Sequence, residues 1–388
     1  MPEFSALNAA HLPAGVTSRF VEGINGLRMH ILEAGAPDKP LLLLLHGFPE
    51  LAYSWRHVMQ PLAELGYHVV APDQRGYGRT TGWRADFDQD LRSFSLLRLA
   101  ADAVALVQAL GRDHAAAIIG HDFGSPVSAW AALTRPDVFR SVVLMSAPFA
   151  GAPPSASAQS EDAKPVSLHA AHDAVAAGLA ALARPRKHYQ WYYATRQANA
   201  DMLHAPQGLH AFLRAYFHFK SADYAGNAPF RLQDASPEQL ALMPAYYIMD
   251  LAHTMAEAVA PFAPPAHEAA QCAWLTESEL AVYAEEFART GFQGGLNWYR
   301  TRFESDIAAD FNLYAGRTID VPSMFIAGRS DWGVYQVPGA FEAMQTRACT
   351  NMRGCHLIEG AGHWVMQEKP SEVVSRLATF LKEAASNG

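Results

Sequence analysis

The sequence predicts an α/β fold in which helices flank a mostly parallel central sheet, with a helical segment inserted into the chain. Short apolar runs alternate with segments of helical periodicity through residues 1–149. The alternation stops at that point and resumes over residues 316–388. Residues 150–315 are rich in helical and aromatic segments. We therefore expect a catalytic domain formed by the two outer parts and a helical cap, or lid, formed by the insertion.

The apolar runs before the insertion are expected to form six strands. Residues 21–35 predict two strands around an Asn-Gly pair, which favours a tight hairpin turn. Residues 40–49 contain an unbroken apolar run, as is typical of a parallel strand covered on both faces. Three further strands are expected at residues 67–73, 115–120 and 140–148.

Helices are expected between these strands. Apolar residues at helical spacing predict helices at 54–66, 95–111 and 125–136, and glycine ends the first two. A Pro/Ser-rich segment at 151–165 predicts a flexible connection into the cap. Beyond the cap, two strands and a closing helix are expected at 320–328, 355–360 and 371–385.

Composition and charge argue against several classes of protein. A chain of 388 residues, half of them hydrophobic, can bury a large core. A formal net charge of -8 argues against nucleic acid or an anionic membrane as the main partner. The apolar runs are too short to span a bilayer. The cysteines Cys272, Cys349 and Cys355 have no CxxC spacing and suit a reducing compartment. We expect a cytoplasmic monomer or homodimer that acts on a small molecule without a metal or organic cofactor.

Four motifs at the expected carboxyl ends of strands carry reactive side chains, at the sheet edge where ligands bind in open α/β folds. They are HGFP (46–49), GHDFG (120–124), SDW (330–332) and GAGHW (360–364). Small residues on both sides of Asp122 fit a sharp strand-to-helix turn that exposes its side chain. Asp122, Asp331 and His363 follow the order nucleophile, acid and histidine of α/β-hydrolases, with aspartate in place of serine.

Each of these three residues has a simpler interpretation when it is considered alone. Asp122 would cap the helix that follows it, Asp331 would be an ordinary loop carboxylate, and His363 would bond to the backbone. Their order and their positions at strand ends together favour a catalytic triad. Because a carboxylate is ionised at neutral pH, Asp122 can attack saturated carbon without a general base.

Longer motifs surround the triad. They are HGFPE, SWR, APDQRGYGRT, GHDFG, GRSDWGVYQ and GAGHWVMQEKP, with HYQWYY (188–193) and GLNWYR (295–300) in the cap. With these motifs the chain resembles the epoxide hydrolases of the α/β-hydrolase superfamily. The resemblance implies an α/β-hydrolase fold with an inserted helical cap, and conversion of an epoxide to a vicinal diol.

The resemblance also implies that two cap tyrosines lie above the nucleophile and donate hydrogen bonds to the leaving oxygen. The matching positions are Tyr189 and Tyr299. Tyr192 and Tyr193 compete with Tyr189 for the first position, because the motif can be aligned in more than one register.

The expected reaction has two steps. Asp122 forms an ester with an epoxide carbon, and water activated by His363 hydrolyses the ester while Asp331 orients the imidazole. The backbone N–H groups of Phe48 and Phe123 are expected to form the oxyanion hole.

Aromatic residues near these motifs predict an apolar tunnel and hence an apolar or aryl epoxide as substrate. The residues expected to contact the substrate are Phe48, Phe123, Phe149, Trp191 and Trp364.

Two other functions remain open at this point. A haloalkane or haloacid dehalogenase would use the same fold and an aspartate nucleophile. Such enzymes commonly hold the halide with Asn or Trp at the positions of Phe48 and Phe123, and haloacid enzymes place an arginine beside the nucleophile. A catalytically silent ligand-binding protein is the alternative from a different class, against which the competent triad argues.

Overall fold

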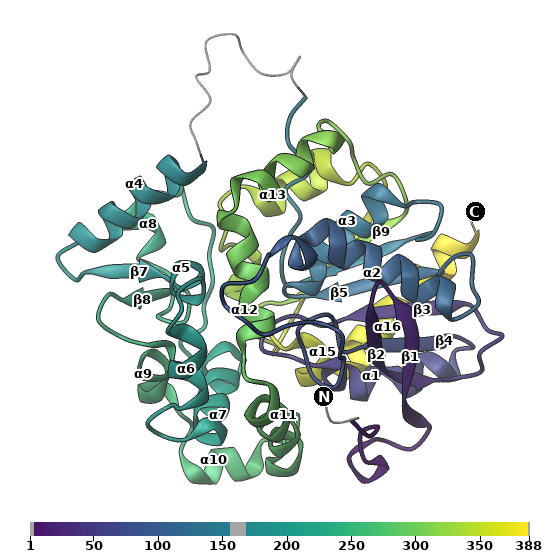
Figure 1. Cartoon of the computed structure of the whole chain (residues 1–388). Coiled ribbons are helices and arrows are strands. Elements are labelled where there is room, and N and C mark those ends of the chain that lie inside the picture. The colour runs from purple at the N-terminus through teal and green to yellow at the C-terminus, as the bar shows by residue number, and fades with distance from the viewer. Residues whose placement is uncertain (1–3, 156–167, 387–388) are drawn as a thin grey trace.

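The structure, a computed structural model, describes residues 4–155 and 168–386 (Figure 1). Its main sheet has eight strands in the order β1-β2-β4-β3-β5-β6-β9-β10. The strands are β1 (Val16–Ile24), β2 (Leu27–Ala34), β3 (Leu41–Leu45), β4 (His68–Pro72), β5 (Ala117–His121), β6 (Val142–Met145), β9 (Ser323–Gly328) and β10 (Met352–Ile358). Among the described strands of this sheet, β1 with β2 and β2 with β4 pair antiparallel and all other neighbours pair parallel, so the mostly parallel sheet is confirmed.

The strands match the apolar runs of the sequence closely. All five side chains of β3 are buried, as expected of a strand covered on both faces. Asn25 and Gly26 have φ of 49° and 84° in the turn that joins β1 to β2. Positive φ at both positions is typical of the tight hairpin turn that the Asn-Gly pair predicted. Two strands begin before their expected starts, β1 at Val16 and β10 at Met352.

Four long helices pack beside this sheet. They are α1 (Arg56–Glu64), α2 (Leu96–Ala109), α3 (Gly124–Thr134) and α16 (Pro370–Ser386). The helix α1 packs against α16, and α2 packs against α3. Each falls within a few residues of its predicted range, so the α/β-hydrolase fold is confirmed. Among the described residues, no helix is both long enough and apolar enough to cross a membrane.

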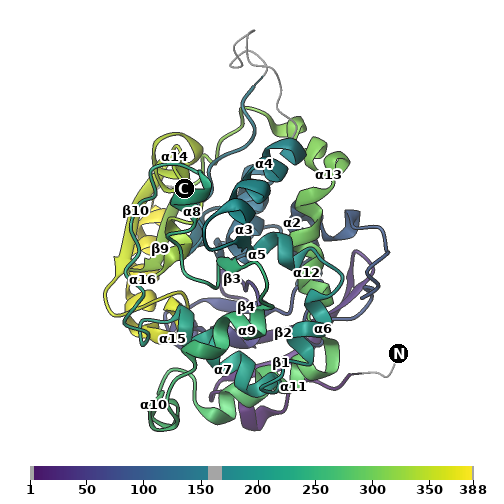
Figure 2. The same ribbon diagram turned by 90° about the vertical axis from the view of Figure 1, so that its left-hand side faces the viewer.

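The chain between β6 and β9 forms a mainly helical body beside the sheet (Figure 1), and Figure 2 shows its helices in front of the strands. Its elements are α4 (Leu168–Ala181), β7 (Arg186–His188), α5 (Tyr189–Tyr193), α6 (Ala198–Leu203), α7 (Leu209–Lys220), α8 (Pro237–Leu240), β8 (Ile248–Asp250), α9 (Met255–Val259), α10 (Ala266–Gln271), α11 (Glu277–Thr290), α12 (Gln293–Arg300) and α13 (Ser305–Asp310). We refer to residues 168–304 as the cap.

The insertion is not a purely helical cap, and parts of it lie outside the cap or outside the described residues. β7 and β8 pair antiparallel, which the sequence did not predict. The rings of Phe311 and Tyr314, just after α13, lie 4.6 and 5.9 Å from the ring of Trp130 in α3, so the end of the insertion packs on the sheet domain. The predicted flexible connection at 151–165 falls mostly outside the described residues.

A buried arginine joins the cap to the sheet domain. Arg56, at the start of α1, is 1% exposed. Its Nε lies 2.8 Å from Glu279 Oε1 on α11, and its other nitrogens donate to Gln367 Oε1 and to the Trp274 carbonyl. A guanidinium is costly to bury without such partners, so this contact fixes α11 relative to the sheet.

The helix α12 approaches the sheet domain through two glycines. A Cβ atom on Gly294 would lie 2.0 Å from the carbonyl oxygen of Gly76, so only glycine allows this contact. Four residues further on, the indole N–H of Trp298 donates to the Arg75 carbonyl at 2.9 Å. Together these contacts hold the end of α12 above the carboxyl ends of the strands.

Candidate active site

Asp122 lies in the sharp turn between β5 and α3. Its φ is 51°, a left-handed conformation that non-glycine residues rarely adopt. A Cβ on Gly120 would lie 2.1 Å from the Gly124 carbonyl oxygen. A Cβ on Gly124 would lie 2.3 Å from the carbonyl oxygen of Leu45. The small residues therefore permit the turn, and the turn presents the Asp122 carboxylate at the carboxyl edge of the sheet.

The two carboxylate oxygens of Asp122 have different surroundings. Oδ1 accepts a hydrogen bond from the Phe48 N–H at 2.9 Å. A Cβ on Gly47 would lie 2.4 Å from Oδ1 and 2.7 Å from the Phe123 nitrogen, so the Phe123 amide borders the same space. Oδ2 lies 3.2 Å from Nε2 of His363. One oxygen thus faces backbone donors, and the other faces the histidine.

His363 is held through its other ring nitrogen. Nδ1 lies 3.0 Å from Oδ1 of Asp331, which also accepts the Gly333 N–H at 2.7 Å. Because the Asp331 carboxylate can only accept, Nδ1 carries a proton, and Nε2 is the ring nitrogen that faces Asp122. Burial opposes the charge of Asp331, but His363, Ser146 and the Gly333 N–H outweigh it and lower its pKa.

Ser146 is a fourth member of this cluster that the sequence analysis missed. Its Oγ lies 2.9 Å from His363 Nδ1, and its φ of 69° places it in the left-handed region. It follows β6 directly, so it ends at the same edge of the sheet as Asp122. A polar residue at the end of an apolar strand was the available signal.

The pKa of Asp122 lies well below its ordinary value. Burial alone would raise it, but the hydrogen bond and charge of His363 and the charges of Lys220 and His121 outweigh that effect. Asp122 is therefore ionised at neutral pH, as a nucleophile requires.

A buried ion pair lies beneath the triad. His121 Nδ1 is 2.6 Å from Glu50 Oε2, and its Nε2 is 2.7 Å from the His363 carbonyl oxygen. Both nitrogens face acceptors, so both must donate and the ring is an imidazolium. Burial opposes this charge, but Glu50 raises the pKa of His121 to about 8. Both residues stand inside predicted motifs, yet their pairing was not foreseen.

Lys220, the last residue of α7, also acts on the site and was not predicted. The residue is 2% exposed, and its ammonium makes no hydrogen bond or ion pair with the described residues. Nζ lies 5.0 to 5.6 Å from the ring centroids of Tyr216, Tyr246, Tyr247 and Trp364. Burial lowers the pKa of Lys220, and the charges of Asp122, Asp331 and Glu50 oppose that shift. Aromatic faces thus enclose a cation within the field of the catalytic carboxylates.

The loop that carries His363 is bound to the cap through its backbone. The His363 N–H donates to the Lys220 carbonyl at 2.9 Å. Glu368 accepts the N–H groups of Gly362, Trp364 and Ala222 at 2.8 to 2.9 Å. The carboxylate of Glu368 therefore joins the histidine loop to the segment that follows α7.

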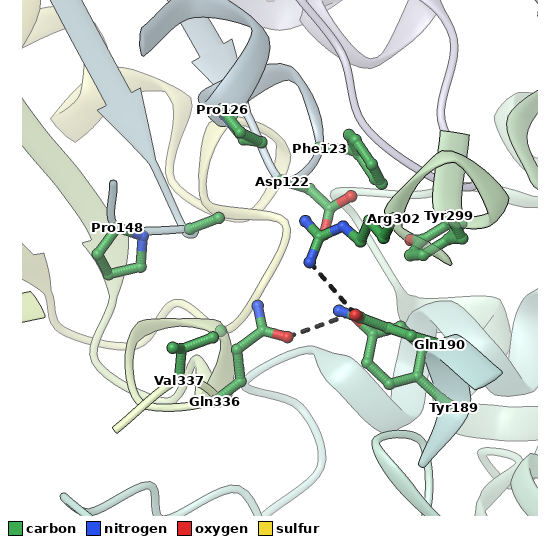
Figure 3. Close-up of a pocket in the computed structure, with 12 residues that line it drawn as sticks. Asp122, Phe123, Pro126, Pro148, Tyr189, Gln190, Tyr299, Arg302, Gln336 and Val337 are labelled. Carbon is green, nitrogen blue, oxygen red and sulfur yellow. Dashed lines mark hydrogen bonds between the residues drawn. The ribbon is translucent and has the colours of Figure 1, made fainter. Parts of the chain in front are cut away.

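Tyr189 and Tyr299 both line the pocket that contains Asp122 (Figure 3). Tyr299 comes from α12 and Tyr189 from the start of α5, with ring centroids 5.9 Å apart. Burial first, and then the charge of Asp122, raises the pKa of both phenols above the ordinary value. Both hydroxyls therefore keep their protons at neutral pH and can donate them.

The competing tyrosines point elsewhere. The Tyr192 hydroxyl donates to Asp201 Oδ2 at 3.0 Å, and the Tyr193 hydroxyl donates to the hydroxyl of Tyr216 at 3.3 Å. Neither residue lines the pocket, whereas Tyr189 does.

The pocket is a cavity of about 90 Å³. Phe123 forms part of its wall, beside Asp122 and the two tyrosines (Figure 3). The remaining wall includes Gln190, Arg302 and Gln336. The pocket is thus more polar than the apolar tunnel that the sequence predicted.

Four of the residues expected to contact the substrate are not among those that line this pocket, namely Phe48, Phe149, Trp191 and Trp364. Phe149 packs edge to face against Trp130, and Trp191 packs on His188, with ring centroids 5.7 and 5.2 Å apart. The indole N–H of Trp364 donates to the Phe217 carbonyl at 2.8 Å. The Phe48 ring packs on other aromatic rings, so this residue reaches Asp122 through its N–H alone. These side chains therefore pack against other aromatic rings and do not form the pocket wall.

Residues 40–193 match the alpha/beta hydrolase fold family. The chain is 33% identical to epoxide hydrolase A of Mycobacterium tuberculosis, over 94% of this chain and 97% of that protein. It is 31% identical to an epoxide hydrolase of Caballeronia sordidicola, over 92% of each. The structure of an epoxide hydrolase from an endophytic Streptomyces matches 96% of this chain and 97% of its own, with 32% identity and a TM-score of 0.74. Potato epoxide hydrolase I matches 95% of this chain and 99% of its own, with 31% identity and a TM-score of 0.70.

The Glu50–His121 pair predicts a pH dependence of stability. Folding raises the pKa of His121 from its ordinary 6.5 to about 8, so the pair stabilises the protein fully below pH 6.5 and loses this effect as the pH rises through 8. Glu50→Gln should therefore destabilise the protein most at low pH. The difference in unfolding free energy between wild type and variant should shrink by about 2 kcal/mol from pH 6.5 to 9.

Urea denaturation at a series of pH values measures this difference. Glu285→Gln, at an exposed position, is the matched control and should show no such trend. A Glu50→Gln effect that stays constant between pH 6.5 and 9 would contradict the assignment of His121 as an imidazolium.

Proposed function

The chain belongs to the epoxide hydrolases of the α/β-hydrolase superfamily, and we propose that it opens its substrate by forming an ester on Asp122. One observation carries this mechanism. Oδ1 of Asp122 is held by the Phe48 N–H, while Oδ2 faces His363 and the pocket under two protonated tyrosines. The carboxylate is thus oriented for attack, and acids are available for the leaving oxygen.

In the first step, Oδ2 of Asp122 attacks one carbon of the epoxide, and the bond from that carbon to the ring oxygen breaks. The ring oxygen takes a proton from Tyr299, or from Tyr189 once the hydrogen bond from its hydroxyl to Gln336 Oε1 is broken. The high phenol pKa values keep these protons in place until an alkoxide of comparable basicity develops. Oδ1 keeps its hydrogen bond to Phe48 throughout.

In the second step, Nε2 of His363 removes a proton from water, and the hydroxide attacks Cγ of Asp122. The negative charge that develops on Oδ1 is stabilised by the N–H groups of Phe48 and Phe123. The Cγ–Oδ2 bond then breaks, and the diol leaves with a proton from the imidazolium. The proton left on the Asp122 carboxyl group passes through water to the tyrosinate, which restores the carboxylate and the phenol. Asp331 stabilises that imidazolium through Nδ1.

Two buried acceptors support the presence of this water. Within the described structure, His363 Nε2 and Glu50 Oε1 are buried and accept no hydrogen bond from the protein. Buried polar atoms of this kind are commonly satisfied by ordered water. Because Nε2 also lies 3.2 Å from Asp122 Oδ2, we propose that the hydrolytic water binds at Nε2 and that Glu50 Oε1 accepts its second hydrogen.

The substrate is proposed to be an epoxide with an apolar or aryl group that packs on Phe123 and Tyr299. Dehalogenation is not supported, because the positions at which such enzymes commonly hold the halide with Asn or Trp are Phe48 and Phe123, whose side chains offer no hydrogen-bond donor. We further propose, from the composition alone, a cytoplasmic monomer or homodimer.

Replacement of the base should trap the ester. His363→Gln removes the group that activates water, so incubation with styrene oxide should raise the intact-protein mass by the mass of one whole epoxide. Asp122→Asn in the same background should abolish the adduct. His204→Gln, at an exposed histidine, is the matched control and should turn over without accumulating an adduct. An adduct of equal yield without Asp122 would contradict the mechanism.

The two cap tyrosines predict a specific defect in ring opening. Tyr299→Phe should slow ester formation by roughly one to two orders of magnitude, because one proton donor is lost, and should leave ester hydrolysis within about threefold. Tyr193→Phe is the matched control, since its ring packs 5.1 Å from that of Tyr299 but its hydroxyl binds Tyr216. Single-turnover kinetics separate the two steps, and equal effects of both variants would exclude the assigned role.

A further inference from the structure

The mouth of the pocket contains an arginine that the proposed mechanism does not use. Arg302 follows Tyr299 by three residues, so both side chains leave the same face of the helical chain that α12 begins. Figure 3 shows the guanidinium pointing into the pocket beside Phe123 and Gln190. The same cavity therefore contains the nucleophile, a phenol and a permanent positive charge.

The guanidinium of Arg302 has no anionic partner among the described residues. One of its nitrogens donates to Gln190 Oε1 at 3.2 Å, and its Cζ lies 5.1 Å from the centroid of the Phe123 ring. These contacts orient the group and leave most of its five N–H donors open. An arginine held in place in this way can accept a carboxylate in a bidentate arrangement.

Neighbouring polar groups make the mouth a donor-rich surface. The Nε2–H of Gln190 donates a hydrogen bond to the hydroxyl of Tyr189, and that hydroxyl donates a hydrogen bond to Gln336 Oε1. The Nε2 group of Gln336 makes no hydrogen bond within the described part of the chain. Apart from Asp122, the pocket wall includes no carboxylate. The open N–H donors of Arg302 and Gln336 therefore favour a ligand that accepts hydrogen bonds and carries a negative charge.

We propose that this epoxide hydrolase acts on short epoxides that carry a carboxylate, which Arg302 binds at the mouth of the pocket. Arg302 and Asp122 line the same small cavity of about 90 Å³, so one short molecule can reach both. The apolar part lies against Phe123 and Tyr299, and the oxirane lies at Asp122. The inference rests on the proposed function and adds the substrate class to it.

The guanidinium also removes an electrostatic obstacle. A carboxylate that enters this cavity approaches the anionic Asp122, and the chain as a whole carries a formal charge of -8. Like charges at short range repel strongly in a partly dry site. A guanidinium in the wall of the same cavity offsets part of that repulsion when it binds the carboxylate, so the arginine would act on binding and on the orientation of the oxirane together.

Matched pairs of substrates test the proposal. The pairs are 3,4-epoxybutanoate with 3,4-epoxybutanamide, and 4-(oxiran-2-yl)benzoate with its primary amide, so that each acid is compared with a neutral isostere. The wild type should prefer at least one acid by roughly tenfold in kcat/KM, as expected for a charge-assisted pair at a partly exposed site. The preference should weaken as the salt concentration rises.

Variants then assign the preference to the arginine. Arg302→Gln should bring the acid-to-amide ratio close to one, mainly through loss of activity on the acid, and Arg302→Lys should keep part of the ratio. Arg353→Gln, which removes an exposed arginine on β10, is the matched control and should leave the ratio unchanged.

The outcomes distinguish this proposal from the function on which it rests. A wild type that hydrolyses acids and amides equally well in both pairs, or a ratio that survives Arg302→Gln, overturns the role of Arg302 while the Asp122 mechanism stands. Failure of the wild type to hydrolyse styrene oxide and all four probes overturns the proposed function itself.

Discussion

Three carboxylates buried at one edge of the sheet are the constraint on which the site depends. Asp122, Asp331 and Glu50 are at most 8% exposed, and a buried charge costs several kcal/mol unless it is paired. Hydrogen bonds from the backbone N–H groups of Phe48, Gly47 and Gly333 offset part of this cost. The structure also supplies three buried cationic or protonatable groups, which are His363, His121 and Lys220.

The cap contributes to this charge balance as well as covering the pocket. Lys220 comes from the cap, and its carbonyl holds the backbone of His363. Glu368 ties the same loop to Ala222. The sheet edge thus provides the nucleophile and the base, while the insertion provides a cation, the phenols and part of the support for the base. A cap displaced from the sheet would disturb both the electrostatics of Asp122 and the position of His363.

The sequence predicted the groups whose positions depend on local chain geometry. Asp122 could be recognised because small residues on either side permit the strained turn, and the strands were visible as apolar runs. Glu50, Ser146 and Lys220 were missed because each acts through a partner that is distant in the sequence. Trp364 and Phe149 do not line the pocket, because their rings pack on other side chains and aromatic content does not reveal which rings pack on one another. The register of Tyr189 likewise depends on which face of α5 meets the pocket.

The position of Arg302 links substrate selection to the chemistry through a single stretch of helical chain. Tyr299 and Arg302 are three residues apart, so any movement of the end of α12 shifts the proton donor and the cation together. Contact between Gly294 and Gly76 anchors the start of that helix to the sheet domain. Binding of the substrate to Arg302 therefore also stabilises the position of the helical stretch that carries Tyr299, the proton donor. Remote binding of this kind accelerates a reaction when it places the reacting atoms in line, and here it would align the oxirane between Tyr299 and Asp122.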